Sequence, residues 1–152
     1  MPNLFNPDFH DFLKAINKHE VDYILVGGYA VILHGYNRVT ADMDIWVKCT
    51  KQNYHKIEQA FLTFGMPLFD MTLEKFLKVE SVDVFRFGRK PVAIDLITKI
   101  KGLDFDEAFQ ESEIRIVDDI PVRLLQYNHL IKAKKSAGRS KDLDDLENLE
   151  SK

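Results

Sequence analysis

The segment that most constrains the fold of this chain is 23–47, in which two apolar runs flank a glycine pair and an acidic pair. The first run, 23–26, is apolar and rich in β-forming residues, and the segment 21–26 predicts a strand covered on both faces. Gly27 and Gly28 break this run, and the residues 29–34 predict a short buried helix. A strand–Gly-Gly–helix connection places free backbone N–H groups where a ligand can approach closely, which favours a phosphate. A tight turn required only by backbone geometry is the alternative explanation.

The acidic pair, Asp42 and Asp44, begins the second predicted strand of this segment, which covers 42–47. Because strand side chains alternate between the two faces of a sheet, both carboxylates are expected on the same face. Two like charges on one face need a counter-charge, and a divalent metal ion is the first candidate. Arg38, in the loop before this strand, is the alternative counter-ion for Asp42.

A third carboxylate interrupts another apolar strand. Residues 82–87 and 92–97 predict a hairpin around the turn 88–91, and Asp95 lies in the second arm, flanked by Ile94 and Leu96. An acid in so apolar a strand is costly to bury without a partner. Alternation places Asp95 on the face opposite to its two neighbours, so it shares a site with the acidic pair if the two strands are adjacent.

The remaining apolar periodicity and capping residues predict several helices and one more pair of strands. The predicted helices are one that starts at 6–8, then 50–65, 72–78, 105–109, 126–137 and a last helix capped by Ser140, and the predicted strands are 113–117 and 120–124. The predicted fold class is α/β (α+β), a mixed sheet of about four or five strands with helices packed on it.

Composition restricts the classes of function. The net charge of −3 argues against a general nucleic-acid coat. The single cysteine, Cys49, cannot form an internal disulfide, which suits a reducing cytoplasm. No apolar run approaches the roughly 20 residues of a membrane helix, and the N-terminus lacks the pattern of a signal peptide. We therefore expect a cytoplasmic protein with no membrane partner.

One local basic cluster departs from the overall acidity. Its members are Lys132, Lys134, Lys135, Arg139 and Lys141. Such a cluster beside a helix start can hold a triphosphate or a nucleic-acid backbone. A pair of solvated helix faces is the alternative, because an acidic run follows directly.

The order of these features resembles a known active-site pattern. Gly27-Gly28, Asp42-x-Asp44 and the later Asp95 are similar to the pattern of the DNA polymerase β-like nucleotidyltransferase superfamily. More narrowly, the stretch GGYAVILHGYNRVTADMDIWV looks like the small bacterial nucleotidyltransferases grouped with the AbiEii-type toxins. The tail is similar to the same group in having a helix lysine, Arg-x-Lys-Asp and a second Asp, here Lys134, Arg139, Lys141, Asp142 and Asp145. The resemblance implies a single nucleotidyltransferase-like domain over 1–152, with its core at 21–100 and a C-terminal helical segment at 126–150.

The resemblance also implies the catalytic and metal-binding residues. Asp42 and Asp44 would bind two Mg²⁺ ions, with Mn²⁺ as the alternative ion. Asp95 would bind the catalytic ion and help deprotonate the acceptor hydroxyl. Two such ions clamp a triphosphate and stabilise the leaving pyrophosphate during in-line displacement.

The implied nucleotide-binding residues surround these carboxylates. Gly27 and Gly28 would hold the triphosphate through backbone amides, and Lys134 would contact the nucleotide phosphates. Arg38 and Thr40 would brace the loop before the acidic pair. The implied pocket is completed by Arg139, Lys141, Asp142 and Asp145, with two roles open for the acids: pairing with the basic residues, or contacting the nucleotide.

The implied function is Mg²⁺-dependent transfer of a nucleoside monophosphate from an NTP to an acceptor hydroxyl, within a toxin–antitoxin system. The acceptor stays open between tRNA, another RNA, a protein and a small molecule such as an aminoglycoside. AbiEii-type toxins generally have a longer C-terminal region, so the acceptor-binding portion is expected to be absent or supplied by a partner protein. One alternative is a nucleotide-binding module with little turnover that acts through a partner. Another is an unrelated α/β domain whose acids only decorate strand ends.

Overall fold

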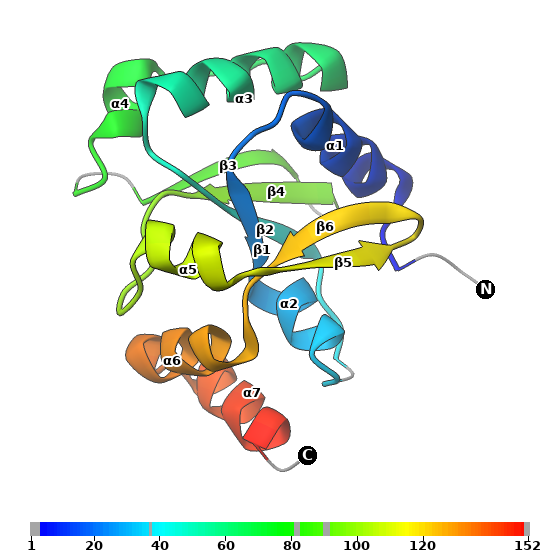
Figure 1. The fold of residues 1–152 in the computed structure, drawn as a ribbon, viewed down its shortest axis with the longest axis vertical. Helices are drawn as coiled ribbons and strands as arrows, with labels where there is room; N and C mark the ends of the chain where they lie inside the picture. The colour runs from blue at the N-terminus through cyan, green and yellow to red at the C-terminus, as the bar shows by residue number, and fades with distance from the viewer. Residues whose placement is uncertain (1–3, 37, 81–82, 90–91, 151–152) are drawn as a thin grey trace.

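The computed structural model, which describes residues 4–36, 38–80, 83–89 and 92–150, contains a six-stranded mixed sheet with helices on both sides (Figure 1). The elements in chain order are α1 (Pro7–Lys18), β1 (Tyr23–Val26), α2 (Gly27–Leu33), β2 (Asp42–Val47), α3 (Lys51–Phe64), α4 (Leu73–Leu77), β3 (Val84–Arg89), β4 (Val92–Ile97), α5 (Phe105–Glu111), β5 (Glu113–Val117), β6 (Ile120–Leu124), α6 (Tyr127–Ala137) and α7 (Ser140–Glu150). The predicted fold class is confirmed.

The strand order is β3-β4-β2-β1-β6-β5. β2 runs parallel to β4 and antiparallel to β1, while β6 runs parallel to β1. The sheet has six strands rather than four or five because the predicted pair at 113–117 and 120–124 joins it through β6. All four residues of the central strand β1 are buried, as its continuous apolar run predicted.

Aromatic side chains hold α1 and α3 against one face of the sheet, where Figure 1 shows them side by side. The ring of Phe12 in α1 meets Phe61 of α3 at 5.7 Å, and Phe61 meets Phe87 of β3 at 4.7 Å, both edge to face. On the other face, Trp46 of β2 contacts Phe105 at the start of α5. Because Trp46 shares this face with Asp42 and Asp44 by alternation, the acids point away from the α1–α3 layer.

Side-chain caps fix the helix starts on which this packing depends. The Asn6 side chain accepts a hydrogen bond from the Phe9 amide, and Thr50 accepts one from the Asn53 amide. The buried Asn53 side chain bonds both backbone groups of Asp22 and the carbonyl of Lys48. It thereby ties the start of α3 to the chain that flanks β1 and β2.

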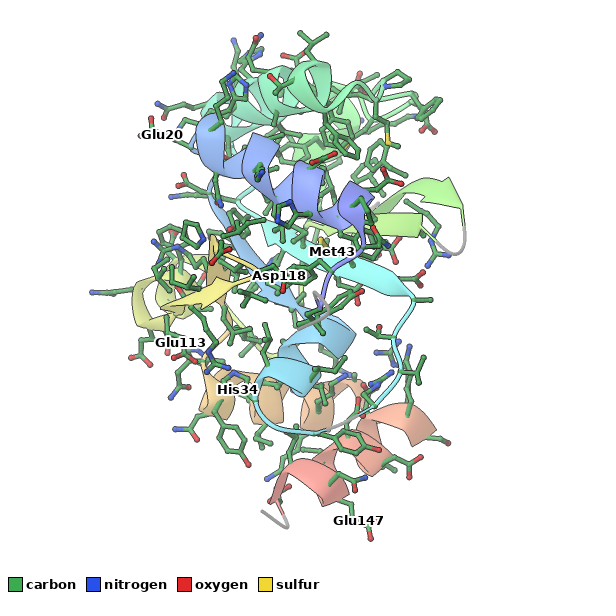
Figure 2. All side chains as sticks on the ribbon, turned by 90° about the vertical axis from the view of Figure 1, so that its right-hand side faces the viewer. Glu20, His34, Met43, Glu113, Asp118 and Glu147 are labelled. Atoms are coloured by element: carbon green, nitrogen blue, oxygen red, sulfur yellow. The ribbon has the colours of Figure 1, made fainter. Side chains whose placement is uncertain are left out.

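The β5–β6 hairpin has a two-residue turn, Asp118-Asp119, in which both residues have positive φ (51° and 66°). Such angles are typical of a type I′ turn, whose twist matches that of the two strands. The Asp118 carboxylate, whose position Figure 2 marks, accepts hydrogen bonds from the amides of Leu4 and Phe5. The hairpin tip therefore holds the segment that leads into α1.

Several predicted boundaries differ from the structure: β1 starts at Tyr23 and not at 21, and α5 ends at Glu111 and not at 109. The helix predicted at 29–34 begins at Gly27, so both glycines form its first turn instead of preceding it. The strand predicted at 82–87 is Val84–Arg89, and Val82 lies outside the described residues. Ser140 is the first residue of α7 and not its cap. Among the described residues, the structure contains no helix whose length and apolar character would let it span a membrane.

Candidate active site

Strand register assembles the site. β2 and β4 pair so that Asp44 lies opposite Asp95, and β4 and β3 pair so that Asp95 lies opposite Arg86. Side chains directly opposite on neighbouring strands are about 5 Å apart at Cβ, so the three form a row across three strands. By strand alternation, Asp42 and Asp44 share one face of the sheet, while Met43 between them, whose position Figure 2 marks, is fully buried on the other. The three predicted carboxylates therefore converge.

Arg86 is the counter-charge of this group. Its Nε and Nη2 donate to the two carboxylate oxygens of Asp95, each at 2.9 Å, and Nη2 also donates to Asp42 Oδ2 at 3.0 Å. The hydrogen bond with Asp95 is the largest cause of a raised pKa of the guanidinium. The alternative in which Arg38 is the counter-ion of Asp42 is wrong, because Arg38 pairs with Asp145 at 2.7 Å.

The single positive charge of Arg86 does not neutralise the charges of all three carboxylates. Burial and, after it, the neighbouring charges of Asp95 and Asp42 together raise the pKa of Asp44 to about 7, against a lowering effect of Lys141. Asp42 Oδ1 is buried and, within the part of the chain that the structure describes, has no hydrogen-bond partner. The site thus retains an unmet demand for positive charge.

Positions 27 and 28 require glycine because neighbouring side chains lie close to the backbone there. Gly27 has a φ of 69°, and a Cβ added there would collide with the carboxylate of Asp44. A Cβ on Gly28 would collide with the side chain of Thr40, whose hydroxyl donates to the Asp42 carbonyl at 3.4 Å. Packing alone therefore explains both glycines, and their contact with a phosphate stays a prediction.

Three of the predicted C-terminal residues, Lys134, Asp142 and Asp145, form a buried ionic cluster between α6 and α7, to which the exposed Arg139 is joined. Lys134 Nζ lies 3.2 Å from Asp142 and 3.0 Å from Asp145, and all three residues are buried. Arg139 Nε donates to Asp142 at 2.6 Å. Burial acts to raise the pKa of Asp142, but the hydrogen bonds from Arg139 and Lys134 outweigh it and lower the pKa below its usual value. The predicted pairing of Asp142 with Arg139 is thus present.

This cluster faces the carboxylates. Arg38, in the loop that leads into β2, reaches Asp145 of α7, which joins the two halves of the chain. The exposed Lys141 lowers the pKa of Asp44, and Asp44 contributes to a raised pKa of Arg139. The tail and the glycine-acid segment therefore share one electrostatic environment.

A divalent cation suits the chemistry of the three carboxylates. They offer only oxygen ligands, as magnesium prefers, and the orphaned oxygen of Asp42 is buried among them. Within the described ranges, however, no three acidic, histidine or cysteine side chains are already arranged as a metal-ligand set. Arg86 lies among these carboxylates.

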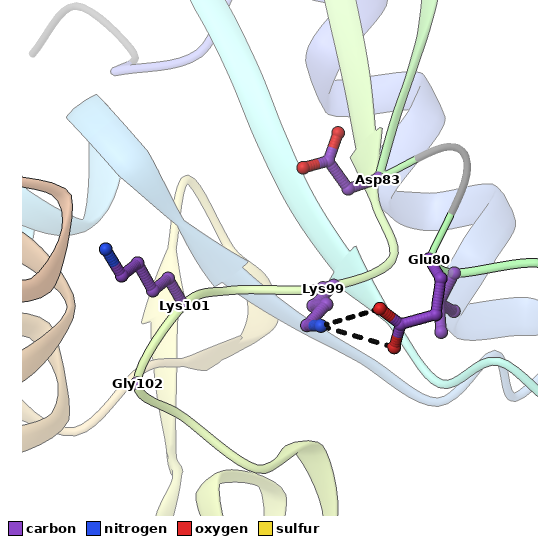
Figure 3. A pocket seen from close by; sticks show the side chains of 6 residues that line it. Glu80, Asp83, Lys99, Lys101 and Gly102 are labelled. Atoms are coloured by element: carbon purple, nitrogen blue, oxygen red, sulfur yellow. Dashed lines mark hydrogen bonds and ion pairs between the residues drawn. The ribbon is translucent and has the colours of Figure 1, made fainter.

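Two other features of the molecule are separate from this site. His34, near the glycines in sequence, has a packing role, because its Nε2 lies 2.7 Å from the Leu125 carbonyl and its ring contacts Tyr127. A separate hollow of about 420 Å³ lies between the residues before β3 and those after β4, where Lys99 pairs with Glu80 (Figure 3). No residue predicted for nucleotide or metal binding lines it.

Sequence reasoning missed Arg86 because it placed the hairpin turn at 88–91, which sets Val84 opposite Asp95. In the structure β3 continues to Arg89 and pairs there with Val92, so that Arg86 lies opposite Asp95. The apolar pattern of the two arms did not indicate this longer pairing.

Comparisons with known proteins bear on the fold. No protein-family model matches the sequence, and a search of curated proteins gives no match. Among solved structures, TM1012 of Thermotoga maritima, a proposed nucleotidyltransferase, superposes with a TM-score of 0.54 at 12% identity, over 98% of this chain and 96% of that chain.

Two antibiotic-modifying proteins also superpose. ANT(2'')-Ia, solved with adenylyl-2''-tobramycin, gives a TM-score of 0.58 at 15% identity, over 94% of this chain and 86% of that chain. The lincosamide antibiotic adenylyltransferase LnuA, solved with lincomycin, gives 0.55 at 16% identity, over 99% of both chains. The chain therefore has the nucleotidyltransferase fold. None of these neighbours bears on the narrower AbiEii-like group.

Proposed function

We propose that the protein is a metal-dependent nucleotidyltransferase that moves a nucleoside monophosphate from an NTP to an acceptor hydroxyl and releases pyrophosphate. The observation that carries this proposal is the convergence of Asp42, Asp44 and Asp95 on adjacent strands, directly beside the start of α2. Three carboxylates in one place are costly without bound cations, and phosphoryl transfer depends mainly on positioning and charge stabilisation.

Within this proposal, the three carboxylates hold Mg²⁺, with Mn²⁺ as the alternative ion. The bound ions supply charge neutralisation of the triphosphate and lower the pKa of the acceptor hydroxyl. Asp95 accepts the proton of that hydroxyl. Asp42 and Asp44 are kept in place by the register of β2 against β1 and β4.

The nucleotide is bound from two sides. In this proposal the backbone N–H groups of Gly27 and Gly28, in the first turn of α2, bind the phosphates. The α6–α7 hairpin supplies the other side of the nucleotide site with Lys134, Arg139 and Lys141. Asp142 and Asp145 hold the first two of these in place. Arg38 and Thr40 brace the loop that leads into β2: Arg38 binds Asp145, and Thr40 donates to the Asp42 carbonyl.

We propose ATP as the donor, since two structural neighbours are named for adenylyl transfer. Among the acceptors left open (tRNA, other RNA, protein and a small molecule), we favour a small molecule, because one of these neighbours was solved with adenylyl-2''-tobramycin and the other with lincomycin. A place in the AbiEii-like group and in a toxin–antitoxin pair is the narrower form of the proposal.

The test is calorimetric titration of each NTP with Mg²⁺, followed by a pyrophosphate-release assay across an acceptor panel. We expect one NTP to bind wild type only with metal, and binding to fall at least tenfold in Asp42→Asn and Asp44→Asn. Asp106→Asn, an exposed acid on α5, is the matched control and should bind as wild type. Metal-independent binding, or equal binding by all four proteins, would refute the proposal.

A second candidate is a nucleotide-binding module with little turnover that acts through a partner protein. It is favoured by the ion pairs that already occupy Arg38, Lys134 and Arg139, since a degenerate site has no need of free cations. Metal-dependent NTP binding with no pyrophosphate release from any acceptor, together with a stable complex with a co-purified protein, would favour this candidate.

A further inference from the structure

Arg86 binds two of the three carboxylates from the edge strand β3. Both oxygens of Asp95 accept from one edge of its guanidinium at 2.9 Å, and Asp42 Oδ2 accepts from the same Nη2 at 3.0 Å. Such bidentate, charge-assisted contacts are among the strongest that a carboxylate forms in a protein. Two of the three acids are therefore bound to an internal cation.

We propose that Arg86 is a positioning residue that stands in for the metal cation, holding Asp42 and Asp95 together in the metal-free protein and giving up Asp95 when the divalent ion binds. A divalent ion coordinated by Asp95 and Asp42 would lie within a few Å of the guanidinium, and like charges at that distance repel strongly. The arginine and the ion therefore compete for the same oxygens. The inference rests on the proposed function only for the identity of the ion.

The Arg86 side chain has open space beside it into which it can move away from the carboxylates. β3 is an edge strand of the sheet, and the Arg86 side chain is 49% exposed although it is paired with two acids. Beside it lies a hollow of about 590 Å³, which Phe69, Lys75 and Lys78 also line. A guanidinium that leaves the carboxylates can therefore rotate into solvent-filled space without disturbing the core.

The alternative is a purely structural ion pair that remains in place when metal binds. A structural pair predicts that removal of Arg86 weakens metal binding, because the carboxylates lose their alignment. Competition predicts the opposite sign. The two explanations are therefore separated by the direction of one measured change.

The experiment is a calorimetric titration of Mn²⁺ and of Mg²⁺, without nucleotide, into wild type, Arg86→Gln and Lys78→Gln. Lys78 lines the same hollow but contacts Glu74 and none of the three acids, so its variant controls for the loss of one nearby positive charge. We expect Arg86→Gln to bind metal about tenfold more tightly than wild type, and Lys78→Gln to change the affinity by less than about twofold. Equal or weaker binding by Arg86→Gln, or no binding by either protein, would overturn the inference.

Thermal unfolding supplies a second readout. In EDTA, Arg86→Gln should unfold at a lower temperature than wild type, and saturating Mg²⁺ should remove most of that difference. A difference of the same size with and without metal would indicate a structural pair. If Arg86→Gln does not fold, Arg86→Lys keeps the charge without the bidentate contact and should bind metal more tightly than wild type. Because these titrations contain no nucleotide, a failure of this inference can be distinguished from a failure of the proposed nucleotidyl transfer.

Discussion

At the scale of single residues, Gly27 links the backbone to the site. Its φ of 69° costs a residue with a Cβ about 1–2 kcal/mol, and the added Cβ would also collide with the Asp44 carboxylate. Gly65, at the end of α3, has a φ of 88° but open space around it, which makes it a matched control. We expect Gly27→Ala to lower the free energy of unfolding by at least about 1 kcal/mol more than Gly65→Ala in urea titrations. Equal losses would mean that the close approach to Asp44 has no energetic weight.

Asp44 gives the metal-free protein a characteristic dependence on pH. Because its pKa is raised to about 7 in the folded state, the folded protein keeps a proton that the unfolded chain loses near pH 4. The unfolded state therefore binds fewer protons in this range, and the free energy of unfolding falls as pH rises from about 4 to about 7. Asp44→Asn removes this effect.

Differential scanning calorimetry in EDTA tests this expectation. Wild type should lose several degrees in Tm between about pH 5 and about pH 8, and Asp44→Asn should lose less, so that the variant is the more stable protein at the higher pH. Asp144→Asn, an exposed acid on α7, should follow wild type. Parallel curves for all three proteins would show that Asp44 ionises normally.

The residue-scale predictions from sequence succeeded where chemistry is local. The face shared by Asp42 and Asp44 follows from strand alternation, and Asp95 was identified because an acid between Ile94 and Leu96 requires a partner. The partner of Arg38 could not be predicted, because Arg38 and Asp145 are 107 positions apart. Helix and strand periodicity relate only residues close in sequence, whereas this contact depends on how α7 packs against the rest of the protein.

At the scale of elements, the ionic cluster decides how α7 is held. Lys134→Ala would leave Asp142 and Asp145 buried without their shared amine, and breaking a buried pair in this way costs about 3–5 kcal/mol. Lys135→Ala, on the exposed side of the same helix, should change stability by less than about 0.5 kcal/mol. Urea unfolding measures both values. A loss below about 1 kcal/mol for Lys134→Ala would show that water enters the cluster.

The elements themselves were largely readable from the sequence, and the differences have local physical causes. Caps such as Asn6 and Thr50 marked helix starts correctly, because a side-chain acceptor satisfies free N–H groups there. The start of α2 was misplaced because glycines usually break helices, whereas here they form the first turn so that Asp44 and Thr40 can approach. The number of strands was set too low because the pairing of β6 with β1 is a long-range contact.

At the scale of the whole molecule, the candidate site combines segments that lie far apart in the sequence. The carboxylates come from β2 and β4, whereas the nearest basic residues come from α6 and α7, and the Arg38–Asp145 pair connects the two groups. Sequence periodicity predicted the carboxylate-bearing strands and the C-terminal helices, but not that they lie next to each other. That arrangement came from the family resemblance and is now described by the structure.

This arrangement predicts which amides respond to ligand. Addition of Mg²⁺ and the bound NTP should slow hydrogen exchange at two distant stretches together, the start of α2 through β2 and the α6–α7 hairpin, because both border the carboxylates. The α1–α3 layer lies on the opposite face of the sheet and serves as an internal control, with little change beyond any global stabilisation (Figure 1). Exchange read by mass spectrometry on peptides from each stretch would test this. Protection confined to the hollow at Glu80 and Lys99 would instead place the nucleotide there and contradict the proposed site.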